Sequence, residues 1–291
     1  MASIMRQVAD HLDVPSDDAM LLRLTNNAVY ALPQAGLVIR ITRSYGLQER
    51  VHKVVTVARW LAEVNAPTIR LAAGRQPIAV DGLLATVWIH IPDHPPKPTA
   101  RDLGPVLRRF HQLGAPPTPL PLWDPVGDAR ARLADAEALP EADRQFLLDW
   151  CDHLEPQIAA LNAQSEAGLV HGDAHAGNLL RRHDGHVVLC DFDATCLGPW
   201  QVDLAAVAVG ELRFGRAGAH AELTAAYGYD VTTDAAWQLF KQARELKMVA
   251  AAVPLLASTP GVAQQFTARL RSIQHRDSSA RWIPFAELRG Q

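Results

Sequence analysis

One short segment of the chain gathers side chains that can hold a hard cation and position a hydroxyl group. It covers residues 168–203 and reads GLVHGDAHAGNLLRRHDGHVVLCDFDATCLGPWQVD. Asp173 and Asn178 precede one strand-like run, and Asp191 follows the next. The Asp184-Gly185 pair between the runs predicts a tight hairpin, which brings its outer ends together. Two carboxylates and an amide oxygen would then converge, and so sparse an oxygen set suits Mg²⁺ with a bound nucleotide better than a closed metal cage.

The same segment allows a second interpretation as a zinc site. His171, Asp173 and His175 alternate along the chain and would share one face of a strand. Clusters of histidine and aspartate are also zinc ligands, so a zinc hydrolase is an alternative. That alternative leaves Asn178 and Asp191 without a role, and we therefore favour magnesium.

The elements that must position these residues differ between the two ends of the chain. Up to about residue 90, apolar runs at 19–24, 28–32, 37–41, 78–80 and 83–89 predict strands, and the three- to four-residue apolar spacing at 47–64 predicts one main helix. Four prolines between residues 92 and 98 predict a domain boundary. Helices are then predicted at 100–113, 126–138, 141–162, 202–214, 218–227 and 234–256. The fold class is therefore α+β, with a small N-terminal antiparallel sheet and a larger, mostly helical C-terminal part.

The motifs of the central segment resemble those of the aminoglycoside phosphotransferase family. Residues 171–178 match HGDxxxxN, and Asp191-Phe192-Asp193 with Gly198-Pro199 and Asp203-Leu204-Ala205 matches the distal pattern of the family. The resemblance implies a bilobal, protein-kinase-like fold. Residues 1–91 would form the nucleotide-binding lobe, and residues 92–291 the lobe for catalysis and acceptor binding.

The resemblance also implies an activity, with several acceptors open. The γ-phosphate of ATP or GTP would pass, with Mg²⁺, to a hydroxyl of an antibiotic such as an aminoglycoside. A kinase for a sugar, an amino alcohol or a nucleoside-type antibiotic is an alternative. A further alternative, of another class, is a non-catalytic nucleotide-binding pseudokinase. It is considered because the N-terminal lobe departs from the family pattern.

Roles for the central residues follow from the same resemblance. Asp173 would position the attacking hydroxyl and accept its proton, and Asn178 and Asp191 would hold Mg²⁺. His171 and Asp203 would fix the catalytic loop, since a reacting carboxylate must keep its geometry. Asp193 would face the substrate or a second metal ion, or would only cap the loop.

The N-terminal lobe offers weaker candidates for nucleotide binding. Arg40 stands on a strand where the family has a phosphate-binding lysine, and it could equally be a surface residue of that strand. Asn27 begins a stretch that looks like the turn of the nucleotide loop. Trp88 and His90 lie where a hinge would contact adenine, although an aromatic residue at a strand end is more often packed in a core.

The usual partner of the phosphate-binding cation is missing from the predicted helix. The glutamate of the family falls near Val54, with Lys53 and Glu49 as its polar neighbours. An intact pair between lysine and glutamate is therefore not predicted.

The distribution of charge gives the one clue to the acceptor. Residues 91–234 carry 11 basic and 21 acidic residues, a net charge of −10. Acidic helices could line a cleft for a cationic acceptor, and solvated helix surfaces would explain them as well. The acids are Asp124, Asp128, Asp149, Asp152, Glu155 and Glu211, of which Asp149, Asp152 and Glu155 are the candidates for acceptor binding. Arginines near the C-terminus weaken the argument for a cationic acceptor.

The whole chain has the composition of an ordinary globular protein. It has 291 residues, 48% of them hydrophobic, and a formal net charge of −3. This balance gives no reason to expect nucleic acid or a membrane as a partner. Three cysteines without CxxC spacing predict reduced thiols, and the N-terminus lacks the pattern of a signal peptide. We expect a cytoplasmic protein whose partners are a nucleotide and a small hydroxylated acceptor, with an oligomeric state that the sequence does not define.

Overall fold

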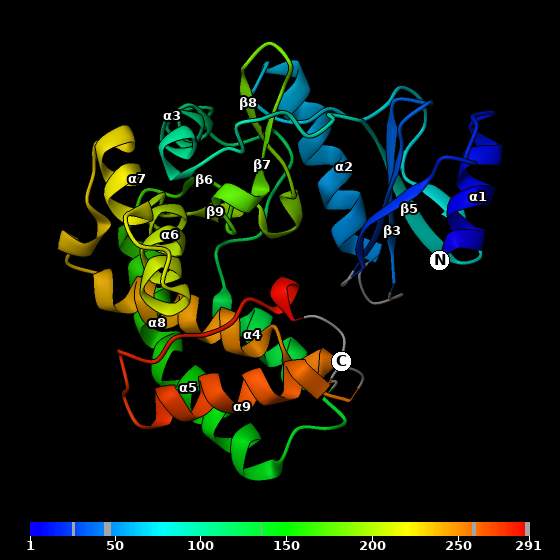
Figure 1. Cartoon of the computed structure of the whole chain (residues 1–291). Coiled ribbons are helices and arrows are strands. Elements are labelled where there is room, and N and C mark those ends of the chain that lie inside the picture. The colour runs from blue at the N-terminus through cyan, green and yellow to red at the C-terminus, as the bar shows by residue number, and fades with distance from the viewer. Residues whose placement is uncertain (25–26, 44–47, 135, 258–259, 289–291) are drawn as a thin grey trace.

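The N-terminal part of the chain is an antiparallel sheet with a helix on each face (Figure 1). The computed structural model describes residues 1–24, 27–43, 48–134, 136–257 and 260–288. The strand order is β1-β2-β3-β5-β4. The strands are β1 (Met20–Leu24), β2 (Asn27–Leu32), β3 (Leu37–Thr42), β4 (Ile78–Val80) and β5 (Leu83–Ile89). These bounds agree with the predicted strands to within a residue. The turn of residues 25–26, which precedes Asn27, lies outside the described residues.

Two helices flank this sheet, where the sequence predicts one. The predicted helix is α2 (Gln48–Glu63), and the additional helix is α1 (Ala2–His11). The buried residues Met5, Val8 and Ala9 of α1 follow helical spacing, but the stretch is too short for a strong periodic signal. Strand alternation decides which side chains meet α1, because neighbouring residues point to opposite faces. Ile39 and Ile41 are fully buried in the core that includes α1, so Arg40 between them faces the other way.

The C-terminal part is mostly helical, as predicted. Its helices are α3 (Ala100–His111), α4 (Pro125–Ala134), α5 (Glu141–Gln164), α6 (Gln201–Phe214), α7 (Ala219–Tyr227), α8 (Trp237–Ala250) and α9 (Pro260–Gln274). The prediction for α8 extends too far, because Pro254 lies in a separate 3-10 turn, Val253–Leu255. Helix α9 was not predicted. The α+β fold class is confirmed.

Two short antiparallel pairs frame the chemical segment. The predicted hairpin is formed by β7 (Leu179–Arg181) and β8 (Val187–Leu189). A pairing that the sequence analysis does not predict joins β6 (Gly168–Val170) to β9 (Cys196–Gly198). The loops that follow β6 and β8 are thereby held between two pairs of strands.

Two apolar cores support this frame. One lies between the sheet and α1, and the other runs from α2 through the helices of the C-terminal part. Strand β5 ends at Ile89 and α3 begins at Ala100, so the proline segment connects them. The domain boundary at residues 91 and 92 stays a prediction. Within the described parts of the chain, every helix is too short or too polar to cross a membrane.

Candidate active site

Asp203 on α6 fixes the loop that carries the candidate catalytic residue. Its side chain is fully buried, and its two oxygens accept hydrogen bonds from the backbone amides of His171 at 2.7 Å and Gly172 at 2.8 Å. His111 of α3, which the sequence analysis missed, contacts Asp203 Oδ2 through Nε2 at 3.0 Å. Burial alone would raise the pKa of Asp203, but the hydrogen bonds from His111 and the backbone hold it below its usual value. The carboxylate is therefore a charged, fully hydrogen-bonded support.

His171 is a second support, and its contacts settle its tautomer. Nε2 donates to the Cys190 carbonyl oxygen at 3.0 Å, and Nδ1 accepts from the Asp173 amide at 3.3 Å. A ring that donates on one side and accepts on the other is neutral. Both nitrogens are used, so His171 cannot bind zinc. In the described ranges no three His, Cys, Asp or Glu side chains form a metal cluster, and the zinc interpretation is wrong.

Gly172 allows the catalytic loop to approach the loop after β8. Its φ is +76°, and a Cβ atom there would lie 2.3 Å from the Ala194 carbonyl oxygen. Only glycine fits such a close backbone approach with positive φ. The glycine of the HGD motif therefore brings Asp173 and the residues around Asp191 into one site.

Asp173 lines a pocket of about 640 Å³. Arg244 of α8 donates to Asp173 Oδ1 at 2.6 Å, and Lys247 donates to the Gly172 carbonyl at 2.6 Å. Burial would raise the pKa of Asp173, but the positive charges of Arg244 and Lys247 outweigh it and hold this pKa well below its usual range. The carboxylate is ionised and only weakly basic, so it is suited to orient a hydroxyl more than to remove its proton early.

His175 lies on the other side of the same carboxylate. Its Nε2 is 3.9 Å from Asp173 Oδ2, and burial lowers the pKa of His175 to about 4. The ring is therefore neutral near pH 7. Arg244 and Lys247 were missed by the sequence analysis, because they lie 71 and 75 residues after their partners Asp173 and Gly172 and carry no local signal.

Asn178 and Asp191 meet at the base of the hairpin, as predicted. The Cys190 amide donates to the Asn178 carbonyl at 2.9 Å, which places the following Asp191 beside Asn178. The Asn178 amide nitrogen donates to the Asp173 carbonyl at 2.9 Å, which turns Oδ1 away from that contact. Asp191 Oδ1 is buried and accepts no hydrogen bond from any described residue. Carboxylate and amide oxygens are the ligands that a hard cation takes, and Mg²⁺ binding by Asn178 and Asp191 stays a prediction.

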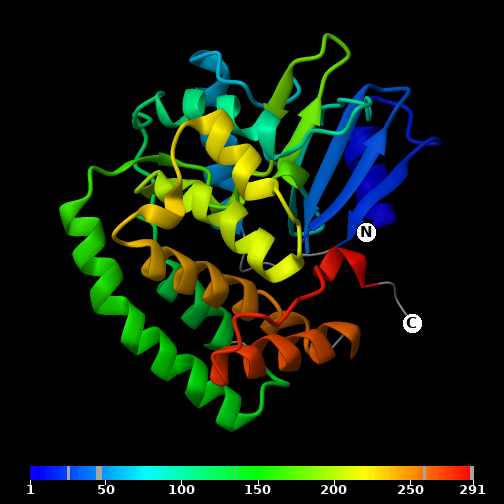
Figure 2. The ribbon, with the colours of Figure 1, turned by 60° about the vertical axis from the view of Figure 1, so that its left-hand side comes forward.

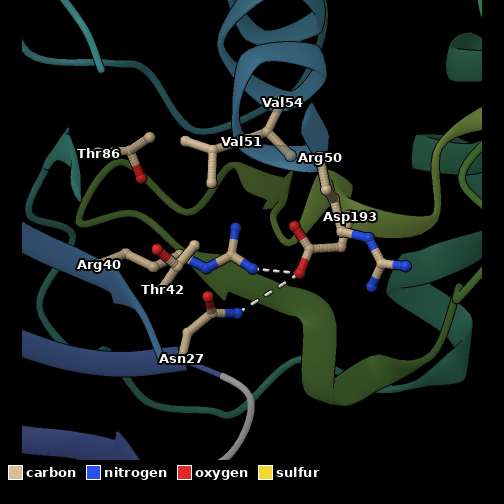
Figure 3. Close-up of a pocket in the computed structure, with 8 residues that line it drawn as sticks. All are labelled: Asn27, Arg40, Thr42, Arg50, Val51, Val54, Thr86 and Asp193. Atoms are coloured by element: carbon tan, nitrogen blue, oxygen red, sulfur yellow. Dashed lines mark hydrogen bonds and ion pairs between the residues drawn. The ribbon is translucent and has the colours of Figure 1, made fainter. Parts of the chain in front are cut away.

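Arg40 reaches across from β3 to the loop after β8 (Figure 3). Its guanidinium donates to Asp193 Oδ2 and lies 3.7 Å from Asp191 Oδ1. Asn27 is next to this pair, and its Oδ1, when turned toward the arginine, accepts from Arg40 Nη2 at 2.6 Å. Burial would lower the pKa of Arg40, but the charges of Asp193 and Asp191 raise it. Arg40 therefore faces the cleft, and its contact with phosphates stays a prediction.

Helix α2 replaces the missing pair of lysine and glutamate with a different contact. Val54 is buried, while Lys53 donates to the carbonyl oxygens of Asp193 at 2.7 Å and Thr195 at 2.9 Å. The helix thus holds the loop backbone directly. The acidic partner of Arg40 comes from that loop and not from the helix.

Trp88 lies near the end of β5, as predicted, and its ring is packed in the core. Its ring is only 4% exposed, it packs 6.0 Å from Phe192, and its Nε1 donates to Thr86 Oγ1 at 2.9 Å. An adenine contact through this ring is therefore wrong, because the large apolar ring stabilises the core instead. His90 is half-buried, and its amide donates to the Gly36 carbonyl at 2.9 Å. An adenine contact by His90 stays a prediction.

The acidic candidates on α5 are wrong as acceptor ligands. Asp149, Asp152 and Glu155 are exposed and do not line the pocket of Asp173. Asp152 and Glu155 pair with Arg130 at 2.6 and 2.8 Å on the outside of the helices. Solvation explains exposed acids without a ligand. Asp124 and Asp128, in contrast, do line the pocket.

The chain is similar to proteins of one known family over most of its length. Residues 23–245 match the phosphotransferase enzyme family (APH). None of the curated proteins matches the chain. A choline/ethanolamine kinase family protein from Mesorhizobium loti has a TM-score of 0.62 and 16% identity, and the match covers 96% of this chain and 97% of that one.

Two further solved structures share the fold. The aminoglycoside phosphotransferase APH(3'')-Id from Streptomyces rimosus has a TM-score of 0.61 and 18% identity over 85% of this chain and 99% of its own. A spectinomycin phosphotransferase in complex with ADP and spectinomycin has a TM-score of 0.58 and 18% identity over 93% and 92%. At these identities the structures show the protein-kinase-like fold alone. Since the family match spans more than half of the sequence, the chain belongs to the phosphotransferase enzyme family, as its aminoglycoside phosphotransferase motifs predict.

Proposed function

We propose that this phosphotransferase transfers the γ-phosphate of ATP or GTP to a hydroxyl group of a small molecule. The observation that carries the proposal is the position of Asp173, an ionised carboxylate in a pocket of about 640 Å³ on a loop fixed by buried Asp203. Phosphoryl transfer needs positioning and charge stabilisation more than covalent chemistry. A site with a fixed, weakly basic carboxylate meets that need.

Each residue has a defined task in this proposal. Asp173 orients the acceptor hydroxyl and takes its proton late in the transfer, because its pKa is low. Asn178 and Asp191 would hold Mg²⁺, which neutralises phosphate charge when bound. Arg40 would bind phosphate oxygens through its planar fork, after exchanging its contact with Asp193.

Several classes of acceptor fit the proposed reaction. The relatives named above include phosphotransferases for aminoglycosides and spectinomycin, which favours a hydroxylated antibiotic. The acidic surface of α5 gives an aminoglycoside no support, because it lies away from the pocket. Kinases for sugars, amino alcohols and nucleoside-type antibiotics remain within the same proposal.

The experiment measures Mg²⁺-dependent nucleotide binding and nucleotide consumption with a panel of hydroxylated compounds. Asp191→Ala should abolish Mg²⁺-dependent binding of the nucleotide, and added zinc should not restore it. Exposed Asp149→Ala is the control and should behave as wild type. Stoichiometric zinc in the purified protein, lost together with activity on chelation, would contradict the proposal.

A non-catalytic nucleotide-binding protein is the second candidate. The ion pair of Arg40 with Asp193 favours it, because this pair occupies the cation that should hold phosphates. Nucleotide binding without consumption, in the presence of every compound of the panel, would select this candidate.

A further inference from the structure

Two cations without a direct ion pair to a described residue line the pocket of Asp173. Arg132 projects from α4 and Lys247 from α8, and both line the same pocket as Asp173. Arg132 is half-buried and forms neither a hydrogen bond nor an ion pair with any described residue. Lys247 donates only to the Gly172 carbonyl oxygen, which leaves two of its three ammonium donors unused.

No carboxylate among the described residues forms an ion pair within 4 Å with either cation, although the charges of Asp128 and Asp173 act on both. Asp173 is paired with Arg244 at 2.6 Å, and Asp124 Oδ1 accepts from the Gly127 amide at 2.7 Å. Asp128 is exposed and forms no ion pair within 4 Å with a described residue. An exposed carboxylate is stabilised by water, whereas a half-buried cation without a direct ion pair recovers only part of its lost hydration.

The electrostatic surroundings agree with this imbalance. Burial, with the positive charge of Arg50, lowers the pKa of Arg132, and the charges of Asp128 and Asp173 oppose this shift. Burial also lowers the pKa of Lys247, against the charge of Asp173. An anion bound between these two side chains would favour the charged form of both.

We propose that Arg132 and Lys247 bind an oxyanion of the acceptor, such as a carboxylate or a phosphate ester, next to the hydroxyl that Asp173 orients. This inference rests on the proposed function. Arg132 supplies a planar fork that matches an oxyanion, and Lys247 supplies a compact charge. Both would also offset the repulsion between the acceptor anion and the γ-phosphate.

The rest of the pocket wall indicates the body of this acceptor. Pro119, Pro121 and Leu122 line the pocket, and Leu122 is 57% exposed. Such a wall suits an apolar group on the acceptor. The acceptor class is therefore a small hydroxylated molecule with an oxyanion and an apolar part, in contrast to a polycation.

The position of the two cations assigns them to the acceptor and not to the nucleotide. Both come from helices of the C-terminal part, whereas Arg40, Arg50 and Lys53 come from β3 and α2. Asp124 and Gly127, near the start of α4, line the same pocket as Arg132. The nucleotide side already has its own cations.

The test uses phenyl phosphate as the probe, because it combines an oxyanion with an apolar ring. Calorimetry would measure its binding to the full chain in the presence of Mg²⁺ and the non-hydrolysable nucleotide AMP-PNP. Wild type should bind the probe, and Arg132→Gln should raise the Kd at least about tenfold, as expected for the loss of a charge-assisted contact. Arg132→Lys should be intermediate. Arg132 forms no hydrogen bond or ion pair with a described residue, so its substitution breaks neither kind of contact there.

Arg130→Gln is the matched control, because it removes the same charge from the same helix. Arg130 pairs with Asp152 and Glu155 outside the pocket, so this variant should bind the probe as wild type does. Equal Kd values for wild type and Arg132→Gln, or no binding by wild type, overturn the inference.

The nucleotide-free protein distinguishes the remaining outcomes. Probe binding that AMP-PNP abolishes assigns the cations to the γ-phosphate and also overturns the inference. If wild type fails to bind Mg²⁺ and AMP-PNP, the proposed function fails by itself. Probe binding that Arg132→Gln weakens would in that case still support the oxyanion site.

Discussion

The two sides of the candidate active site are held together in different ways. The catalytic loop is fixed by a fully buried carboxylate, Asp203, whose contacts with His171, Gly172 and His111 involve no substrate. The proposed nucleotide side is held by ion pairs of Arg40 and Arg23 with Asp193 and Asp191, whose side chains are 15 to 51% exposed. Buried, satisfied hydrogen bonds make a permanent frame, whereas partly exposed ion pairs exchange easily. The catalytic side is thus preformed, and the nucleotide side is arranged for exchange.

Asp173→Asn should give the largest effect, and it acts on the preformed side alone. We expect turnover to fall by about 10² to 10⁴, because the variant removes the group that orients the hydroxyl and takes its proton. Binding of Mg²⁺ and nucleotide should stay nearly intact. Steady-state kinetics with nucleotide titration would measure both, with Asp149→Asn as an exposed control. Near-wild-type turnover would falsify the assignment of Asp173.

Asp203→Asn tests whether the frame is permanent. Replacing the buried carboxylate with a side-chain amide should lower the free energy of unfolding by about 3 to 5 kcal/mol. One of the two backbone N–H groups then faces the NH₂ group of the new side chain and loses its acceptor. Chemical denaturation followed by fluorescence would measure the loss. Asp230→Asn is a matched control, since Asp230 also contacts a histidine, His220, at 3.0 Å but is 40% exposed, and it should cost less than about 1 kcal/mol. Similar losses for both variants would contradict the difference between buried and exposed pairs.

Arg40→Ala tests the exchangeable side. The nucleotide KM should rise by about 10- to 100-fold, as expected for the loss of a charged contact with phosphates, while the free energy of unfolding changes little. Arg40→Lys should raise the nucleotide KM less than Arg40→Ala does, because the charge remains although the fork is lost. Arg6→Ala, on the exposed surface of α1, serves as the control. Unchanged nucleotide kinetics in Arg40→Ala would leave the phosphates to other groups.

Arg244→Gln should give the smallest effect at pH 7 and a clear one in acid. In wild type the depressed pKa of Asp173 keeps it ionised, so its protonation should not limit activity above about pH 5. Without Arg244, the largest of the charges that lower this pKa is lost, so the pKa should rise and activity should fall with decreasing pH at a higher pH than in wild type. A pH profile of kcat/KM for both proteins measures the shift. If kcat/KM falls at the same acid pH in both proteins, Arg244 does not control the ionisation of Asp173.

The local chemistry of the catalytic segment was predictable from sequence. One hairpin contains the Asp184-Gly185 turn and the two strands beside it, with Asn178 and Asp191 at its base. Short-range turn chemistry and strand alternation set their positions, so no distant contact was needed. The alternation in β3 likewise places Arg40 on the face opposite Ile39 and Ile41.

Other parts of the site were decided only by the tertiary structure. His111, Arg244 and Lys247 reach the loop from α3 and α8, and Asp193 pairs with Arg40 from 153 residues away. Helical spacing shows that a residue lies on a helix, but the packing of that helix decides what its side chain meets. The burial of Trp88 and the exposure of Asp149, Asp152 and Glu155 have the same cause. Sequence spacing determined the hairpin and its motif, whereas the packing of distant helices set the charge around Asp173, because electrostatic interactions depend on distance in space and not along the chain.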